Sequence, residues 1–166
     1  MRRPFFPACI MLIVVFIFSS VNAQTHKTLE PYLIDLDGWE AEAPEGLTAE
    51  MSGITVINAM RTYYNDDSDL SAVIMIGSQA MITQETEITW ESAEGSMTSQ
   101  EIDGFRVTAG YDRDEQRGMI SVLLARTEQQ AAVFILNYEY LDPQAALELA
   151  KKFDWKAVSD AVKKLM

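Results

Sequence analysis

The chain has 166 residues, 48% of them hydrophobic, and a formal net charge of −12 at pH 7. This length is enough for one domain that buries its own hydrophobic core without disulfides or metals. The acidic balance excludes nucleic acid and anionic lipid surfaces as expected partners, because both repel a negatively charged protein.

Residues 1–23 have the features of a secretory signal peptide. Arg2 and Arg3 form a positive start, the apolar core "CIMLIVVFIFSS" follows, and Val21 and Ala23 complete a small-x-small cleavage pattern. This apolar core is shorter than the roughly 20 residues that a membrane-spanning helix needs, so an uncleaved membrane anchor is the less favoured alternative. We therefore predict cleavage after Ala23 and a periplasmic or secreted protein without a stable membrane span. The "RRPFF" start leaves open whether export is general or uses the twin-arginine route.

Cleavage would change the chemistry that the mature chain can perform. It would remove the only cysteine, Cys9, together with two arginines, leaving 11 basic and 25 acidic residues and a net charge of −14. We therefore expect no disulfide, no thiolate catalysis and no cysteine metal site.

The next segment is an acidic lead-in, residues 24–50, followed by a single α+β domain, residues 51–166. We expect the lead-in to be extended, with room for a short strand, and to pack on the domain. β-branched and aromatic residues predict strands in "ITVINAMRTYY" and "LSAVIMIG", residues 54–64 and 70–77. The "NDDSD" between them has the composition of a hairpin loop.

The middle of the chain predicts a mixed crossover and then a meander. Residues 79–99 show no clear period, whereas Asp103-Gly104 is a strong tight-turn signal. The alternation in "FRVTAGY", residues 105–111, suits an edge or one-sided strand. Two more hairpin connections, "DRDEQRG" and "TEQQ", continue the meander to Tyr140.

The chain ends in helix, either one bent helix or two short ones. Asp142 is a suitable N-cap, Pro143 suits the first helical position, and Asp154 can cap a second helix. Favourable charge pairs are expected on the outer face, Glu148 with Lys152 and Asp160 with Lys164.

Three predicted strands are apolar on both faces, residues 70–77, 118–126 and 131–138. Both faces of their sheet must therefore be covered. The predicted fold is α+β: an antiparallel β-sheet meander covered by a C-terminal helix and by a less regular second layer, which the lead-in and the crossover would supply.

The search for chemistry leaves few candidates. His26, the only histidine, lies near the predicted mature terminus. The sequence contains neither the "GxSxG" motif of a nucleophilic serine nor a glycine-rich phosphate-binding loop. Among the carboxylates, Glu139 between two tyrosines is the best candidate for acid-base work. The turn with Asp112, Asp114 and Glu115 is a weak calcium candidate, since neighbouring arginines would oppose a cation. We expect no cofactor.

The segment "DGWEAEAPEGLTAEMSGITVINAMRTYYNDDSDLSAVIMIG", residues 37–77, resembles uncharacterised exported bacterial proteins. The resemblance rests on Gly38, Trp39, Arg61 and Tyr63 with strand spacing between them. These proteins are similar in architecture to the PsbP-type α/β/α sandwich. The resemblance implies an accessory or binding module without inherited catalytic residues.

The sequence thus predicts an exported, non-enzymatic binding or accessory module of a Gram-negative cell envelope, which acts on a protein or small ligand. The alternatives are a carboxylate-dependent hydrolase and a structural envelope protein. The predicted contact surface comprises Trp39, Arg61 and Tyr63 near the first strand, and a basic helical face of Lys151, Lys152 and Lys156.

Overall fold

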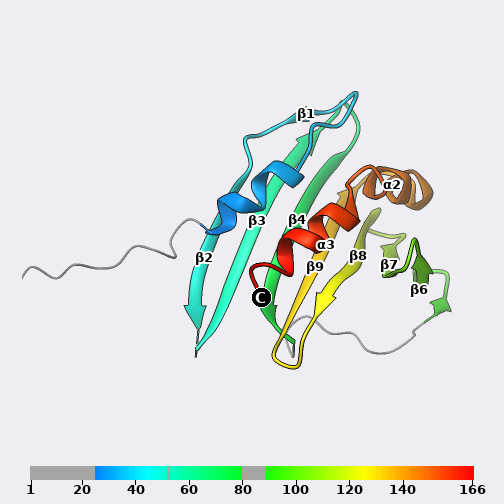
Figure 1. Ribbon diagram of the computed structural model, residues 1–166. Helices are drawn as coiled ribbons and strands as arrows, with labels where there is room; N and C mark the ends of the chain where they lie inside the picture. Colours follow the sequence, from blue (N-terminus) through cyan, green and yellow to red (C-terminus); the bar gives the residue numbers. More distant parts are fainter. Residues whose placement is uncertain (1–24, 52, 80–88) are drawn as a thin grey trace, which may run out of the picture.

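The computed structural model describes residues 25–51, 53–79 and 89–166. The predicted signal peptide and the core of the predicted crossover lie outside these residues. The fold is α+β and dominated by a nine-stranded antiparallel sheet in the order β1-β3-β4-β9-β8-β7-β6-β5, with β2 also paired to β3 (Figure 1). The strands are β1 (Glu40–Ala41), β2 (Glu45–Met51), β3 (Ile54–Tyr64), β4 (Asp69–Ser78), β5 (Trp90–Glu91), β6 (Gly95–Ile102), β7 (Phe105–Asp112), β8 (Arg117–Arg126) and β9 (Gln130–Glu139). The helices are η1 (Thr25–Thr28), η2 (Glu30–Tyr32), α2 (Pro143–Ala150) and α3 (Trp155–Val162).

The predicted hairpin between the first two long strands is confirmed. Asp69 already belongs to β4 and pairs with Tyr64. The side-chain oxygen of Asn65 accepts hydrogen bonds from the backbone N–H groups of Asp67 and Ser68, at 3.0 and 2.9 Å. The loop is therefore held by local side-chain to backbone bonds, the usual role of Asn in turns.

The predicted meander is also confirmed, but it is longer than expected. Asp103 and Gly104 have φ angles of 52° and 81°, so both central residues of this tight turn are left-handed. The strand before the turn, β6, was missed and assigned to the crossover. It carries few apolar residues because it lies close to the sheet edge. As a result β7 is an interior strand and not an edge strand.

The C-terminal region contains two short helices. The Asp142 carboxylate accepts bonds from the N–H groups of Gln144 and Ala145, and the Asp154 carboxylate accepts one from Ala157. Both predicted caps are therefore confirmed. The predicted partners of both acids were wrong: Glu148 pairs with Lys151 and not with Lys152, and Asp160 pairs with Lys156, one turn before it, and not with Lys164.

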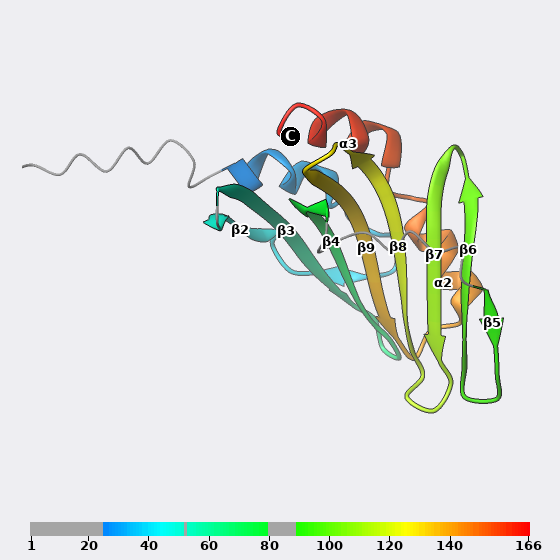
Figure 2. The ribbon, with the colours of Figure 1, turned by 90° about the horizontal axis from the view of Figure 1, so that it is seen from below.

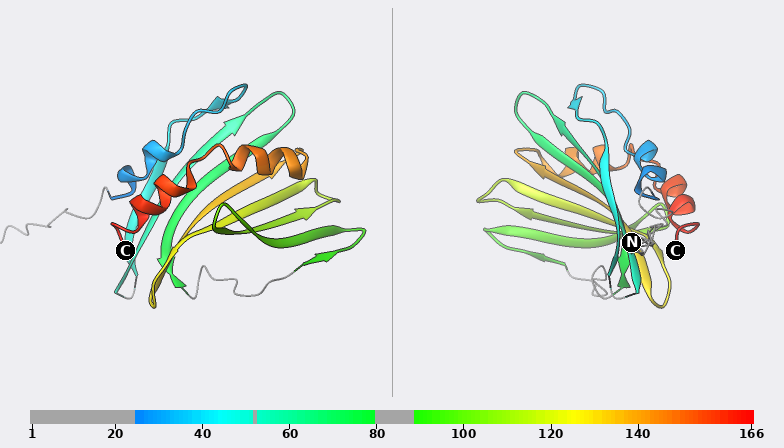
Figure 3. Two further views of the ribbon diagram at one scale, coloured as in Figure 1. Left: turned by 45° about the vertical axis from the view of Figure 1, so that its right-hand side comes forward. Right: turned by 90° about the vertical axis from the view of Figure 1, so that its left-hand side faces the viewer.

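One face of the sheet carries the helical layer and the hydrophobic core. The lead-in and the C-terminal helices lie side by side on this face (Figures 1 and 3). Leu29 and Leu33 of the lead-in share one cluster of buried residues with Phe153 and Val158. The lead-in thus packs on the domain as predicted, but it does not form a second layer. Its first part is less extended than predicted, because it forms two 3-10 helices, whereas the strand for which the prediction left room is present as β2.

The opposite face of the sheet, called the open face below, is covered by none of the described helices (Figure 2). Along β4, Leu70, Ala72 and Ile74 are buried under the helices, whereas Val73 and Met75 on the open face are only half-buried. No helix in the described ranges is long and apolar enough to span a membrane.

Candidate functional site

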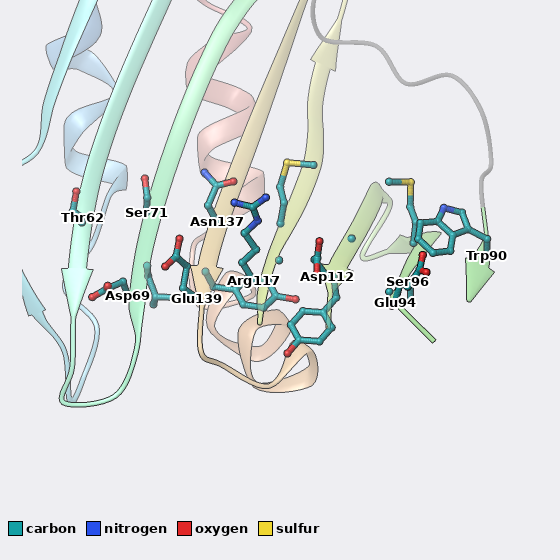
Figure 4. Close-up of a pocket in the computed structure, with 18 of the residues that line it drawn as sticks. Thr62, Asp69, Ser71, Trp90, Glu94, Ser96, Asp112, Arg117, Asn137 and Glu139 are labelled. Carbon is teal, nitrogen blue, oxygen red and sulfur yellow. The ribbon is translucent and has the colours of Figure 1, made fainter. Parts of the chain in front are cut away.

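The open face contains a groove with a volume of about 740 Å³. It crosses the sheet from the end of the β3–β4 hairpin to β5 (Figure 4). Two neighbouring rows of side chains build most of its surface, because residues paired across antiparallel strands project from the same face.

The first row is charged. Asp69 on β4 lies opposite Glu139 on β9, Glu139 lies opposite Arg117 on β8, and Arg117 lies opposite Asp112 on β7. Figure 4 shows these four residues in that order across the sheet. Glu94 adds a further carboxylate beyond Asp112.

The second row changes from polar to apolar along the groove. It begins with Thr62, Ser71 and Asn137 on β3, β4 and β9. It continues through Met119, Gly110 and Met97 to Trp90 on β5. The groove therefore has a hydrophilic end at β4–β9 and an apolar end at β5–β6.

Gly110 creates a hollow between the two methionines. A Cβ atom built on Gly110 would meet only the terminal methyl of Met97, at 3.8 Å. The space above this glycine is thus empty. Trp90 stands at the edge of the hollow with 45% of its surface exposed.

Two stacked tyrosines line the groove from the helical side of the sheet. The rings of Tyr111 and Tyr138 are 6.2 Å apart and inclined by 9°. Gly118 lies between them in the strand pairing, and a Cβ atom there would be 2.2 Å from Cζ of Tyr138. Burial raises the pKa of Tyr138 to about 12, and its hydroxyl has no hydrogen-bond partner among the described residues. Only glycine at position 118 permits this stack.

Arg61 and Tyr63, two of the predicted binding residues, form hydrogen bonds to the lead-in. Arg61 donates from Nε to the carbonyl of Glu42 at 2.8 Å, from Nη1 to the carbonyl of Leu33 at 2.8 Å, and from Nη2 to Asp35 at 2.6 Å. The hydroxyl of Tyr63 donates to the carbonyl of Ile34 at 2.8 Å.

Arg61 and Tyr63 share one face of β3, as predicted, and the guanidinium lies 5.4 Å from the tyrosine ring centre. Tyr63, however, is completely buried, and Trp39 is half-buried against the core cluster. These side chains fasten the lead-in to the sheet. The prediction that Tyr63 offers its side chain to a partner was wrong, because the lead-in already occupies it.

The predicted basic residues are exposed at the turn between α2 and α3 and on α3. Lys151 and Lys156 are in ion pairs with acids of their own helices, and Lys152 is exposed beside Phe153. Phe153 contacts Tyr63 edge to face, with ring centres 6.3 Å apart. The two halves of the predicted surface are therefore neighbours, but they lie on the helical side and not at the groove.

The weak calcium candidate is a structural turn. Asp112 accepts bonds from the N–H groups of Asp114 and Glu115, and Glu115 forms an ion pair with Arg117. Within the described ranges no group of three or more histidine, cysteine or acidic side chains is placed to hold a metal ion.

Sequence reasoning singled out Glu139 but missed its partner Asp69 and the whole apolar end. The alternation of residues 105–111 carries a usable signal, because it puts Gly110 on the same face as the polar Arg106 and Thr108. The partners across the strands could not be read without the register. Comparisons with models of protein families, with curated proteins and with solved structures gave no match for this chain.

Proposed function

We propose that this protein is an exported, non-enzymatic binding module, which holds a small ligand or a segment of a partner protein in the open-face groove. The observation that carries the proposal is the hollow at Gly110, flanked by Met97, Met119 and Trp90 within a groove of about 740 Å³. This volume is in the usual range for ligand sites, which combine apolar walls with a few polar groups.

The side chains at the hollow can adapt to apolar groups of different shapes. Methionine is unbranched and polarisable, so it adapts to different apolar groups. A half-exposed tryptophan offers a large apolar surface with one polar atom. The resemblance of residues 37–77 to exported proteins of the PsbP type supports the same role as an accessory or binding protein.

A carboxylate-dependent hydrolase is the second candidate, because the sheet register brings Asp69 and Glu139 together in the groove. General acid catalysis by a carboxyl group needs apolar surroundings that favour the protonated form. Both side chains are exposed to solvent. This exposure favours a binding role for the pair. Turnover of chromogenic glycosides that is lost in both Asp69→Asn and Glu139→Gln would establish the hydrolase instead.

Site-specific photo-crosslinking in the cell envelope tests the binding function. A crosslinking residue in place of Ser71 probes the groove, and one in place of the exposed Lys163 probes the helical side as a control. We expect an adduct of defined mass from position 71 and none from position 163. Gly110→Leu, which fills the hollow, should abolish the adduct.

A second blocking variant protects the test against misfolding. Asn137→Phe introduces bulk at an exposed position of the same row. Thermal unfolding of both variants checks that they are folded. Adducts that survive both substitutions, or that arise only from position 163, would refute the proposed function.

A further inference from the structure

We propose that the groove binds a cationic, extended segment of a partner protein, in which lysine or arginine stands a few residues from a large apolar side chain. This inference rests on the proposed binding function, and it assigns the chemical class of the occupant. It is carried by three features: the carboxylates along the groove, two of which lack an ion-pair partner at the β4–β9 end, the hollow at the β5–β6 end, and the distance between these ends.

The acidic end holds two carboxylates that lack a counter-charge. Asp69 and Glu139 are direct partners in the pairing of β4 with β9, and like charges in such positions oppose strand pairing. Both are exposed, and neither is within ion-pairing distance of a described cationic side chain. A cationic group bound between them would relieve this repulsion.

The arginine in the same row does not neutralise the groove. Arg117 is in an ion pair with Glu115, which lies in the turn between β7 and β8. The groove itself presents four carboxylates and this one guanidinium. The negative potential therefore extends along the groove from Asp69 to Glu94, and it would attract a cationic partner before contact.

The apolar end supplies an anchor site. The hollow above Gly110 has room for a side chain, and Met97 and Met119 can adjust around it. The indole of Trp90 can pack against an apolar group or against a cation. A cationic ligand without an apolar group would leave the hollow at Gly110 unfilled.

The distance between the two ends selects a chain segment over a small ion. Glu139 lies on β9 and Trp90 on β5, with β8, β7 and β6 between them. Four strand spacings of about 4.8 Å amount to roughly 19 Å. An extended peptide advances about 3.3 Å per residue, so about six residues connect the two ends.

Calorimetry with synthetic peptides on the mature protein tests the proposal. The probe is a short peptide with lysines flanking a Trp-Leu pair. One comparison peptide has glutamate for each lysine, and another has serine for Trp and Leu. We expect the first peptide to bind, the glutamate peptide not to bind, and the serine peptide to bind more weakly. Raising the salt concentration from about 0.05 M to about 0.3 M should weaken binding, because it screens exposed charges.

A charge-matched pair of variants shows where the cation binds. Asp69→Asn with Glu139→Gln should weaken binding of the lysine peptide about tenfold, as loss of two exposed charge contacts would. Glu50→Gln with Glu128→Gln removes two exposed charges away from the groove and should leave binding unchanged. Equal effects of the two pairs, or equal binding of the glutamate peptide, would overturn the cationic assignment.

The outcome separates this inference from the proposed function. If the cationic assignment fails while Gly110→Leu still abolishes the crosslink from position 71, the groove binds a ligand of another class. If neither experiment responds to groove substitutions, both proposals fail. Self-association that the Asp69→Asn, Glu139→Gln variant abolishes would also overturn the assignment, because the lysines on α2 and α3 of a second copy would then be the occupant.

Discussion

The side chain of Arg61 alone forms three hydrogen bonds to the lead-in. Its planar guanidinium reaches two backbone carbonyls and one carboxylate of that segment, and only 14% of the side chain is exposed. Lysine has a single charged centre and cannot match this fork geometry. The energetic value of the contact lies mainly in the bond to the carbonyl of the buried Leu33, since Asp35 is largely exposed and its ion pair is screened by solvent.

The first prediction concerns this side chain. Arg61→Ala should lower the free energy of unfolding by about 2–3 kcal/mol, because hydrogen bonds to a charged donor are lost and the carbonyl of Leu33 loses its partner. Arg61→Lys should recover part of the loss. Urea unfolding measures both, and limited proteolysis should show faster cleavage in residues 25–42 of the alanine variant. An unchanged unfolding midpoint for Arg61→Ala would refute this role.

The buried tyrosines make stability depend on alkaline pH. Burial raises the pKa of Tyr63 from the ordinary tyrosine value of 10.0 to about 12. Burial likewise raises the pKa of Tyr138 to about 12. The folded protein therefore holds these phenolic protons more tightly than the unfolded chain does. The resulting stability is complete below pH 10 and is lost as the pH rises from about 10 to about 12.

The second prediction follows from the loss of stability at alkaline pH. The urea midpoint should fall across that alkaline range, and Tyr63→Phe and Tyr138→Phe should each reduce the fall. At neutral pH, Tyr63→Phe should cost about 1 kcal/mol through its lost bond to Ile34, whereas Tyr138→Phe should cost nothing, because its hydroxyl has no partner. Tyr140→Phe removes an exposed phenol and serves as the control. A midpoint that is flat between pH 10 and 12 would contradict the argument.

Among the secondary-structure elements, α3 is joined to the sheet by a side-chain hydrogen bond at a β-bulge in β8. The register between β8 and β9 shifts between Leu123 and Ala125, so Leu124 lies in a bulge. A bulge leaves part of the backbone outside the ladder. The hydroxyl of Ser159 on α3 donates to the carbonyl of Leu124 at 2.7 Å, and Ser159 is only 2% exposed.

The third prediction tests this junction. Ser159→Ala should lower the free energy of unfolding by about 1–3 kcal/mol, because the buried carbonyl of Leu124 would lose its partner. Thermal unfolding measures the change. Ser159→Thr retains the hydroxyl but adds a methyl group, so it should lose stability through crowding while it retains the bond. Equal stability of Ser159→Ala and the parent protein would show that the helix is held by apolar packing alone.

At the scale of the whole molecule, stability should decrease from the centre of the sheet to its edges. β4 and β9 pair along ten residues and are bounded by long strands on both sides. β6 has only the two-residue strand β5 on its outer side. Local opening exposes backbone most easily where one side of a strand is unpaired.

The fourth prediction is that amide hydrogens of β4 and β9 exchange most slowly, and that those of the outer strands β2 and β6 exchange faster than those of the strands between them. Hydrogen exchange followed by mass spectrometry measures this order. Slow exchange along Thr98–Ile102 would mean that something covers the outer edge of β6, and it would contradict the prediction.

Across the whole molecule, basic and acidic side chains also lie in different regions. The five lysines after Pro143 lie on the helical side, whereas the carboxylates of the groove lie on the open face. The sequence showed the contrast between an acidic body and a basic end. It could not show that the two ends of this contrast lie on opposite sides of one sheet.

Local structure could be predicted from the amino-acid sequence, because short-range signals in it are strong. Asp103-Gly104 required left-handed backbone, Asn65 could close its own loop, and Asp142 and Asp154 could cap their helices. Weak patterns mislead for the same reason: β6 has only Met97 and Ile102 among small and polar residues, so little in its composition distinguishes it from a crossover.

Which face each segment covers, and which side chains meet, depends on the packing of the whole chain. The lead-in lies beside the C-terminal helices because Arg61 and Tyr63 project from that face of β3 and bind its carbonyls. Asp69 meets Glu139, and Gly110 opens between Met97 and Met119, because strand register aligns residues from different parts of the chain. Register is a property of the paired strands together, so the groove could not be read from any one of them.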